Sequence, residues 1–499
     1  MRLFDNPIFL TQKRLTHRGG VWAAILISAL IGGSLLAGLL VQVTDPRPLF
    51  LRSHEAGKMF YAWALGIEAV VLVLGGFAKT VRVLGDERRT GLWDSNRLTP
   101  LSPARIVLGY WLGSPLRESY MAAIFAGIGF AIVVVGRLPL SLWLGTQLMV
   151  ISTALFFGLL ALVIGMAFDR PKSGVALFLP LILLCAFSGG APKYCVFQFF
   201  LPAYAASSLF SDSTDAGNPF QPDSYGWPAI FTFDVPPMVL SLGLQLLMGL
   251  LLWRAAVRKI GHPSQPLFLR WEAVMIFTVV VTVQHALLWS IWTGSYPTQA
   301  IWALNYRRYI LPLVHGGSLL VGMLVLAVSS PLPERVRIEA LRSNAAPRLA
   351  LARSALPLAL LLAAITGLAS LPHFISSPRA YGIVWGLATA NLLACFATFC
   401  LLLEYCRLRF RQGAPGFVAL GLFILGVLPL ILAALFSNES LSLLSFLAPG
   451  IMALLEPARV ASRDQLLLLT LPQLGVVGAL LFAWWQQWQK LFARATQRP

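Results

Sequence analysis

The chain has 499 residues, of which 58% are hydrophobic and only 12% are charged, and its mean hydropathy is +0.76. Because soluble domains carry about 25% charged residues, this composition excludes a soluble protein and indicates helices that cross a bilayer. The formal net charge of +18 could suggest a nucleic-acid binder. The basic residues lie between long apolar runs, however, and this distribution excludes that class.

The hydropathy pattern predicts an all-α, polytopic helix bundle with about twelve membrane-spanning helices, since a bilayer core about 30 Å thick requires about 20 apolar residues per helix. When the N-terminus is placed in the cytoplasm, most of the 38 Lys and Arg fall in cytoplasmic segments. Basic loops resist translocation, so both termini are predicted to be cytoplasmic. The predicted spans are residues 21–43, 59–78, 115–136, 141–168, 173–190, 236–253, 271–292, 309–329, 356–373, 381–403, 417–436 and 465–488.

The spans divide into two six-span halves at a basic stretch that contains Pro and Gly, residues 254–270. A basic loop at 331–353 occupies the position in the second half that 87–109 occupies in the first, and both divergent duplication and coincidence explain it. The predicted segments are an amphipathic cytoplasmic interface helix (1–20), a first half (21–260) with a cytoplasmic loop (80–114) and an outer loop (191–235), and a second half (261–499).

The most informative segment is polar and follows the second span: ERRTGLWDSNRLTPLSPARIVLG, residues 87–109. Ser102-Pro103 and Ser114-Pro115 each place a hydroxyl before a proline, which is typical of a helix start, so we expect a helix over about 103–113. Residues 84–98 are expected to form another helix, which ends before Thr99-Pro100 because a residue before proline disfavours the helical region. Asp86 and Glu87 near its start suit the helix dipole.

The helix over 103–113 carries Ile106, Val107, Tyr110 and Trp111 on one side, and is expected to lie at the membrane interface with Trp111 and Tyr110 at the level of the lipid headgroups. The upstream residues present charged and aromatic side chains on the cytoplasmic face. Two interpretations fit such a segment: a docking site for a protein partner, or a loop that folds back on its own helices.

The segment resembles the first cytoplasmic loop of the permease subunits of bacterial type-2 ATP-binding-cassette (ABC) exporters. Residues 6–15, NPIFLTQKRL, are similar to the N-terminal amphipathic helix of these permeases, and the resemblance covers residues 1–260. The sequence departs from the usual loop pattern at Leu92, at 95–97 and at Tyr110. The matching residues are Glu87, Gly91, Trp93, Asp94, Leu98, Thr99, Pro100, Leu101, Ser102, Ile106, Val107, Leu108 and Gly109.

The resemblance implies that this loop docks into a groove of an ATPase subunit, so that nucleotide-driven movement of the ATPase reaches the membrane helices. It implies apolar anchors at Trp93, Leu98 and Leu101, and a bend held by Pro100. Polar contacts at the rim of the docking site would come from Glu87, Arg88 and Asp94. The interfacial helix would comprise Ser102, Pro103, Ile106, Val107 and Trp111.

The sequence contains no Gly-x-x-x-x-Gly-Lys-Ser/Thr loop, so the ATPase, with its ATP and magnesium, is expected to be a separate chain. No catalytic residue, cofactor or metal site is expected in this chain. The implied partners are the ATPase, a second permease copy or a paralogue, and membrane lipid, with no nucleic acid. The implied location is the bacterial inner membrane, and the transported substrate is not identified by the sequence.

Glu68 lies inside the second predicted span, where a carboxyl group is costly and can mark a transport pathway. The alternative is a carboxyl group that burial keeps neutral, or that forms a hydrogen bond with a neighbouring helix. Two other classes fit a chain with this many spans. One is a membrane enzyme resembling lipid-linked glycosyltransferases, for which Asp45 is a candidate, and the other is a secondary transporter.

Overall fold

The structure is a computed structural model that describes residues 6–18, 20–44, 53–167, 196–200, 229–230, 233–262, 265–292, 356–376, 379–409 and 474–490 except 488, with a few residues between 318 and 329. The chain divides into two compact units. Unit 1 comprises Met1–Pro228 and Phe233–Pro263, and unit 2 comprises Ala229–Thr232 and Ser264–Pro499.

Helices dominate both units in the part of the chain that is described, which confirms the predicted all-α class. Unit 1 contains α1 (Pro7–Arg18), α2 (Val21–Thr44), α3 (Ser53–Ala69), the π-helix η2 (Val70–Gly75), α4 (Gly76–Thr90), α5 (Leu92–Leu98), α6 (Pro103–Gly113), α7 (Leu116–Val135), α8 (Leu140–Ala167), the 3₁₀ helix η4 (Val196–Phe200), the two-residue strand β2 (Phe233–Asp234) and α11 (Pro237–Gly261). Unit 2 contains the two-residue strand β1 (Ala229–Ile230), α12 (Arg270–Trp292), α16 (Leu356–Ser376) and α17 (Arg379–Arg409), and residues 474–487 are also helical.

Five helical segments among the described residues are long and apolar enough to cross a membrane: Val21–Val43, His54–Thr90, Leu116–Val135, Leu140–Met166 and Pro237–Gly261. Many apolar side chains of α2 are exposed, with Trp22 70% exposed, and such a surface suits lipid rather than water. The fold is therefore that of an α-helical membrane protein.

The count of twelve spans and the side of the termini stay predictions. The spans expected at 173–190 and 417–436, and most of the one at 309–329, lie outside the described residues.

The second predicted span is the middle part of a longer helical rod, which runs from residue 53 to residue 90 through α3, η2 and α4. The backbone stays helical at both joints, with φ −61° at Ala69 and φ −60° at Gly76. A helix of about 20 residues suffices to cross a bilayer. The rod is therefore long enough to extend beyond the bilayer core.

The helix expected over 84–98 is in fact two helices, α4 and α5, which meet at Gly91. The Gly91 backbone has φ +75°, a left-handed conformation that ends α4 and that glycine adopts without steric cost. Asp86 and Glu87 consequently lie near the C-terminal end of α4 rather than near a helix start. The prediction that a helix ends before Thr99-Pro100 is confirmed, because α5 ends at Leu98.

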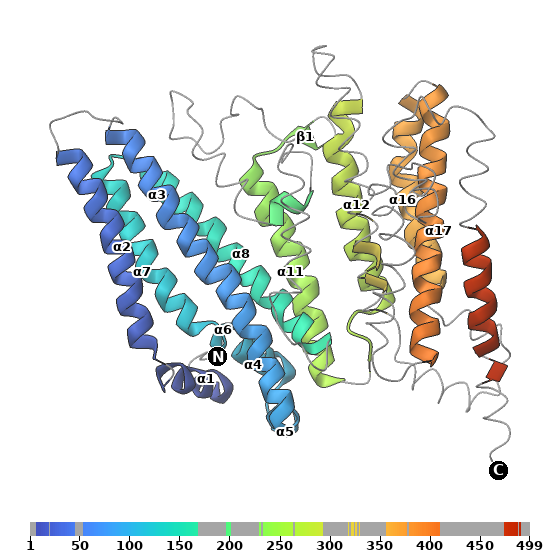
Figure 1. Cartoon of the computed structure of the whole chain (residues 1–499), viewed down its shortest axis with the longest axis horizontal. Coiled ribbons are helices and arrows are strands. Elements are labelled where there is room, and N and C mark those ends of the chain that lie inside the picture. The colour runs from blue at the N-terminus through green and yellow to red at the C-terminus, as the bar shows by residue number, and fades with distance from the viewer. Residues whose placement is uncertain are drawn as a thin grey trace, which may run out of the picture. The chain divides into compact units, whose positions relative to one another are not determined.

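In unit 1, α3 and α2 pack against α7, α4 packs against α8, and α8 packs against α11. A close backbone approach joins α3 to the turn after α7, where a Cβ on Gly57 would lie 2.9 Å from the Gly136 Cα atom. In Figure 1, α1 runs across the lower end of α2, and α5 projects below the long helices of the unit. The segment singled out in the sequence is thus at one end of the bundle.

Unit 2 contains a separate packed group, in which α12 packs against α16 and α16 packs against α17. The ring of Phe277 on α12 meets the ring of Phe396 on α17 edge to face, with centroids 5.9 Å apart. The helices of this group consist mainly of apolar residues. No residue of the candidate site belongs to unit 2.

Candidate functional site

The candidate site is a projecting knob, which we define as residues 91–102: Gly91, the two-turn helix α5 and the turn that leads to α6. The turn is held by the hydroxyl of Thr99, which donates a hydrogen bond to the backbone oxygen of Asn96 at 2.6 Å. Thr99 has an extended backbone, φ −68° and ψ 155°, as the proline that follows it requires. Gly91 precedes the first residue of α5 and Pro100 follows Thr99 at its end, so these two residues mark the ends of α5.

The start of α6 agrees with the prediction, since Ser102 precedes the first turn and Pro103 occupies its first position. The expected span of 103–113 is the observed one. The Ser102 hydroxyl makes no capping hydrogen bond, so the proline alone accounts for this start. Ser114 ends α6 rather than starting α7, which begins after Pro115.

Glu87, on the last turn of α4, is the centre of a polar cluster that joins four helices. Its carboxylate accepts hydrogen bonds from the Gln12 amide of α1 at 2.8 Å and the Asn96 amide of α5 at 3.4 Å. It also accepts one from the Tyr110 hydroxyl of α6. The Asn96 amide in turn donates to the Tyr110 oxygen at 2.7 Å. Hydrogen bonds to a charged acceptor are stronger than neutral ones, so this carboxylate fixes the knob to its neighbours.

Tyr110 remains protonated as the donor in this cluster. Burial, followed by the negative charge of Glu87, raises the pKa of the Tyr110 hydroxyl above its ordinary value of 10.0. The side chain is fully buried, and this differs from the expectation that Tyr110 lies at the lipid headgroups. The phenol therefore serves an internal contact.

Trp93 attaches α5 to the body of unit 1. It is only 5% exposed, and its ring lies 5.5 Å from the ring of Tyr110, centroid to centroid. The Arg88 guanidinium lies over the Trp93 ring, 5.8 Å from its centroid, a distance suited to a cation–π contact. Trp93 is thus buried within this chain, and the resemblance had implied an anchor for a partner at this position.

The apolar residues that the knob exposes are Leu98, which is 88% exposed, and Leu92, which is 54% exposed. Asp94 and Pro100 are exposed beside them, whereas Thr99 and Leu101 are half-buried. The two leucines are the first and last residues of α5, and large exposed apolar side chains of this kind can be contacted by another protein. Their docking role stays a prediction.

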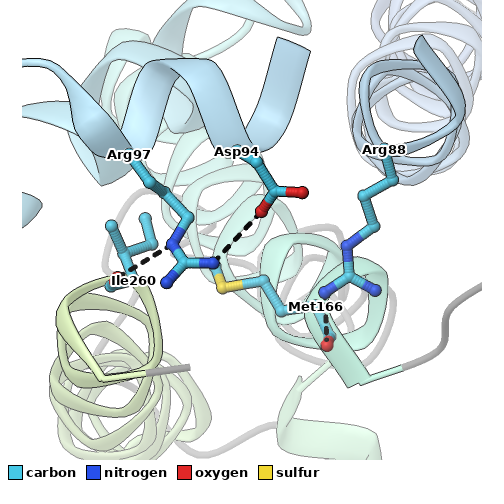
Figure 2. Close-up of polar contacts among 5 residues, drawn as sticks. All are labelled: Arg88, Asp94, Arg97, Met166 and Ile260. Carbon is cyan, nitrogen blue, oxygen red and sulfur yellow. Dashed lines mark hydrogen bonds and ion pairs between the residues drawn. The ribbon is translucent and has the colours of Figure 1, made fainter. Parts of the chain in front are cut away.

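Two arginines reach from this region to the ends of two long helices (Figure 2). The Arg88 guanidinium donates a hydrogen bond to the Met166 backbone oxygen in the last turn of α8, at 2.8 Å. The Nε atom of Arg97 donates to the Ile260 backbone oxygen in the last turn of α11, at 3.2 Å, and its Nη1 atom lies 3.3 Å from an Asp94 carboxylate oxygen. No role for Arg97 was predicted from the sequence.

The N-terminal helix α1 is docked on α6. Asn6 caps the start of α1, since its side-chain oxygen accepts a hydrogen bond from the Ile8 backbone N–H at 3.0 Å. The Asn6 amide donates to the Arg105 backbone oxygen of α6 at 2.7 Å. The two helices approach closely because α6 carries glycine at 109 and 113. A Cβ on Gly109 would lie 2.8 Å from the Ile8 Cβ. The Gly-x-x-x-Gly spacing of 109–113 is the signal in the sequence for this contact.

The residues expected to form an interfacial face of α6 contact protein instead. Ile106 and Val107 are fully buried. Trp111 is half-buried: its indole N–H donates to the Leu155 backbone oxygen at 2.9 Å, and its ring lies 5.7 Å from the ring of Trp253. These contacts show that other helices of unit 1 cover much of this face of α6.

Glu68 is buried inside unit 1 at the end of α3. Its carboxyl oxygen accepts a hydrogen bond from the Gln147 amide of α8 at 2.8 Å. On the same helices, the hydroxyls of Tyr61 and Thr146 are hydrogen-bonded to each other. This is the inter-helix contact that one interpretation expected, and the role of Glu68 in a pathway stays a prediction.

Comparison with protein-family models, with curated proteins and with solved structures finds no match. Within the described part of the chain, no group of three or more His, Cys, Asp or Glu side chains could hold a metal ion. Asp45 and most of the outer loop 191–235 lie outside the described residues.

Proposed function

We propose that the chain is the permease subunit of an ABC exporter and that its knob docks on a separate ATPase subunit. The knob is the observation that carries this proposal. It ends a helical rod long enough to cross the membrane, it projects beyond the bundle (Figure 1), and it exposes Leu92 and Leu98 at its surface. A membrane bundle needs a rigid element of this kind when a partner with two states is to move it.

The rigidity of the knob is the second support. A seven-residue helix is not stable by itself in water, yet α5 is held by the Glu87 cluster and by the burial of Trp93. A loop that merely connected two spans would not need a carboxylate with donors from three other helices. A movement of a partner bound at Leu98 would therefore be transmitted to the helices that contact α5.

The topology follows from the charge distribution of the sequence. The knob and both termini lie on the cytoplasmic side of a bacterial inner membrane, and the chain crosses that membrane about twelve times. The chain itself hydrolyses nothing, and the ATP and magnesium belong to the ATPase. Either a second permease copy or the second half of this chain completes the pathway for the exported substrate.

Co-purification tests this proposal. The tagged chain is purified from its native membrane in mild detergent, and associated proteins are identified by mass spectrometry. A protein with the Gly-x-x-x-x-Gly-Lys-Ser/Thr motif should be present, and the complex should hydrolyse ATP. Leu98→Arg and Leu92→Arg should remove that protein while the chain still inserts in the membrane.

Leu15→Arg is the matched control, since Leu15 is an exposed leucine of α1, 55% exposed, and lies outside the knob. This variant should retain the ATPase. If the wild-type chain brings down no ATPase, or if the control loses it as fully as the knob variants, the proposal is wrong. Glu68 would then be the first residue to test in a self-contained transporter or enzyme.

A further inference from the structure

We propose that Arg88 and Arg97 are positioning residues that link the knob to the ends of α8 and α11, so that the knob and these two ends move together. The inference rests on the proposed function for its purpose. Its structural content, a rigid link between three helices of unit 1, can be tested on the chain alone.

The two arginines donate to backbone oxygens at the C-terminal ends of helices. Met166 and Ile260 lie in the last turns of α8 and α11, where backbone oxygens have no partner within their own helix. The same turns carry the negative end of the helix dipole. A guanidinium donor satisfies both conditions, so each arginine stabilises the helix end that it contacts.

The donors come from the two sides of Gly91. Arg88 precedes the bend on α4, and Arg97 lies on the last turn of α5, so the two contacts bracket the bend (Figure 2). Arg88 also covers the ring of Trp93, which buries the base of α5. One contact thus holds the chain before the bend and another holds it after the bend, and neither contact involves Leu92 or Leu98.

The helices at the receiving ends are joined to each other within the bundle. The Gln245 amide of α11 donates to the Thr153 hydroxyl of α8 at 3.0 Å, in a buried site. A displacement transmitted to the ends of α8 and α11 thus reaches a packed pair of long helices. This gives the knob a direct route into the bundle besides the covalent route through α4 and α6.

A competing explanation is that Arg97 simply pairs with Asp94 on the surface. The Asp94 side chain is 76% exposed, and exposed ion pairs contribute little. The two explanations predict different effects of removing Asp94. Loss of the ion pair alone should leave the contact between Arg97 and Ile260, and with it the position of α5.

Hydrogen exchange on the full chain in lipid nanodiscs tests the link without any ATPase. Arg97→Met and Arg88→Met keep an unbranched apolar stem but remove the donors, and the backbone amides of 92–98 should exchange about tenfold faster, since hydrogen bonds from charged groups are the stronger class. Arg97→Lys should restore part of the protection. Asp94→Asn and Arg89→Met, which removes an exposed arginine of the same helix, should leave the exchange unchanged.

A second measurement follows the movement itself once the ATPase is bound. Spin labels replace two exposed residues, Ser95 on α5 and His262 after α11. In the otherwise wild-type chain, the distance between the labels should stay constant when ATP is added. In Arg97→Met the distance distribution should broaden, while the ATPase still binds with an affinity within about twofold, because the exposed leucines are intact.

The two proposals fail in different ways. If no ATPase binds but exchange responds to the arginine variants, the link exists and the exporter function is wrong. If the ATPase binds but exchange at 92–98 is unchanged in both methionine variants, or rises equally in Arg89→Met, the link is wrong and the function stands. The same conclusion follows when Asp94→Asn reproduces Arg97→Met, because the surface ion pair would then explain the effect.

Discussion

The hydroxyl of Tyr110 donates a hydrogen bond to the carboxylate of Glu87, and this contact joins α6 to the last turn of α4. The two residues are 23 positions apart, and the whole knob lies between them. The contact therefore holds together the two segments that flank the knob.

Tyr110→Phe removes this donor and keeps the ring that contacts Trp93. We expect the free energy of unfolding to fall by about 1.5–3 kcal/mol, the usual contribution of a hydrogen bond to a charged group. Thermal unfolding in detergent measures the change. Tyr120→Phe is the control, since the contact of Tyr120 with His17 is between rings. Equal stability of the two variants would show that the hydrogen bond from Tyr110 to Glu87 contributes nothing to the free energy of unfolding.

The same hydroxyl predicts a dependence on pH in the alkaline range. The pKa of Tyr110 is raised in the folded chain above the ordinary 10.0, so above pH 10 the unfolded chain loses this proton while the folded chain keeps it. Stability from this group is complete below pH 10 and falls as pH rises through the raised pKa. The free energy of unfolding is measured about one pH unit below and about one pH unit above 10. Its decrease between these two pH values should be smaller in Tyr110→Phe than in the wild type. A loss of the same size in both would contradict the assignment.

Gly91→Ala tests the bend between α4 and α5. No atom lies within 4 Å of a Cβ added at Gly91, so the substitution makes no steric contact. The left-handed backbone, φ +75°, still costs a residue with a Cβ about 1–2 kcal/mol. Thermal unfolding should show this loss, whereas Gly127→Ala, equally free of contacts but within α7, should be neutral or stabilising. Unchanged stability of Gly91→Ala would mean that the bend has another conformation.

Gly109→Val tests the docking of α1 on α6. A Cβ at this position already lies 2.8 Å from the Ile8 Cβ and 3.1 Å from the Asn6 amide nitrogen, so α1 must move away. We expect a loss of about 1–3 kcal/mol and faster proteolysis within residues 6–18. Gly33→Val is the control because nothing lies near Gly33. Undisturbed α1 in Gly109→Val would show that the contact is looser than described.

Gln147→Leu tests the buried contact of Glu68. The substitution removes the amide that donates to the Glu68 carboxyl group at 2.8 Å, and we expect a loss of about 1–3 kcal/mol, the cost of a buried polar group without its partner. The double variant Glu68→Leu/Gln147→Leu should be more stable than Gln147→Leu alone, because no polar group is then left unpaired. Additive losses in the double variant would argue that the two side chains do not depend on each other.

The elements of unit 1 could be predicted where the sequence marks them locally. The bounds of α6 follow from Ser102-Pro103 and Ser114-Pro115, and the end of α5 follows from Thr99-Pro100. The break at Gly91 could not be predicted with the same certainty, since a single glycine is tolerated within many helices. Its left-handed φ is a property of the folded chain rather than of the local sequence.

The site was predicted less well than the elements because its contacts join distant parts of the chain. The contact of Arg88 with Met166 spans 78 positions, and that of Arg97 with Ile260 spans 163. A single sequence shows that α6 has an apolar side, but not that α1, about 100 residues earlier, covers part of α6. For the same reason Trp93 resembles an exposed anchor until Tyr110 and Arg88 are placed around it.

The π-helix η2 has a consequence for how this chain tolerates changes in length. A π turn contains one residue more than an α turn, so deletion of Leu72 within Val70–Gly75 can be absorbed by conversion to regular α-helix. The side chains of α3 and α4 would then point toward the same neighbouring helices as before. Deletion of the exposed Arg82 in α4 would instead rotate everything beyond it by about 100°, and Glu87 would turn away from Gln12 and Tyr110. The rod thus contains a built-in place where one residue can be lost while the knob keeps its orientation.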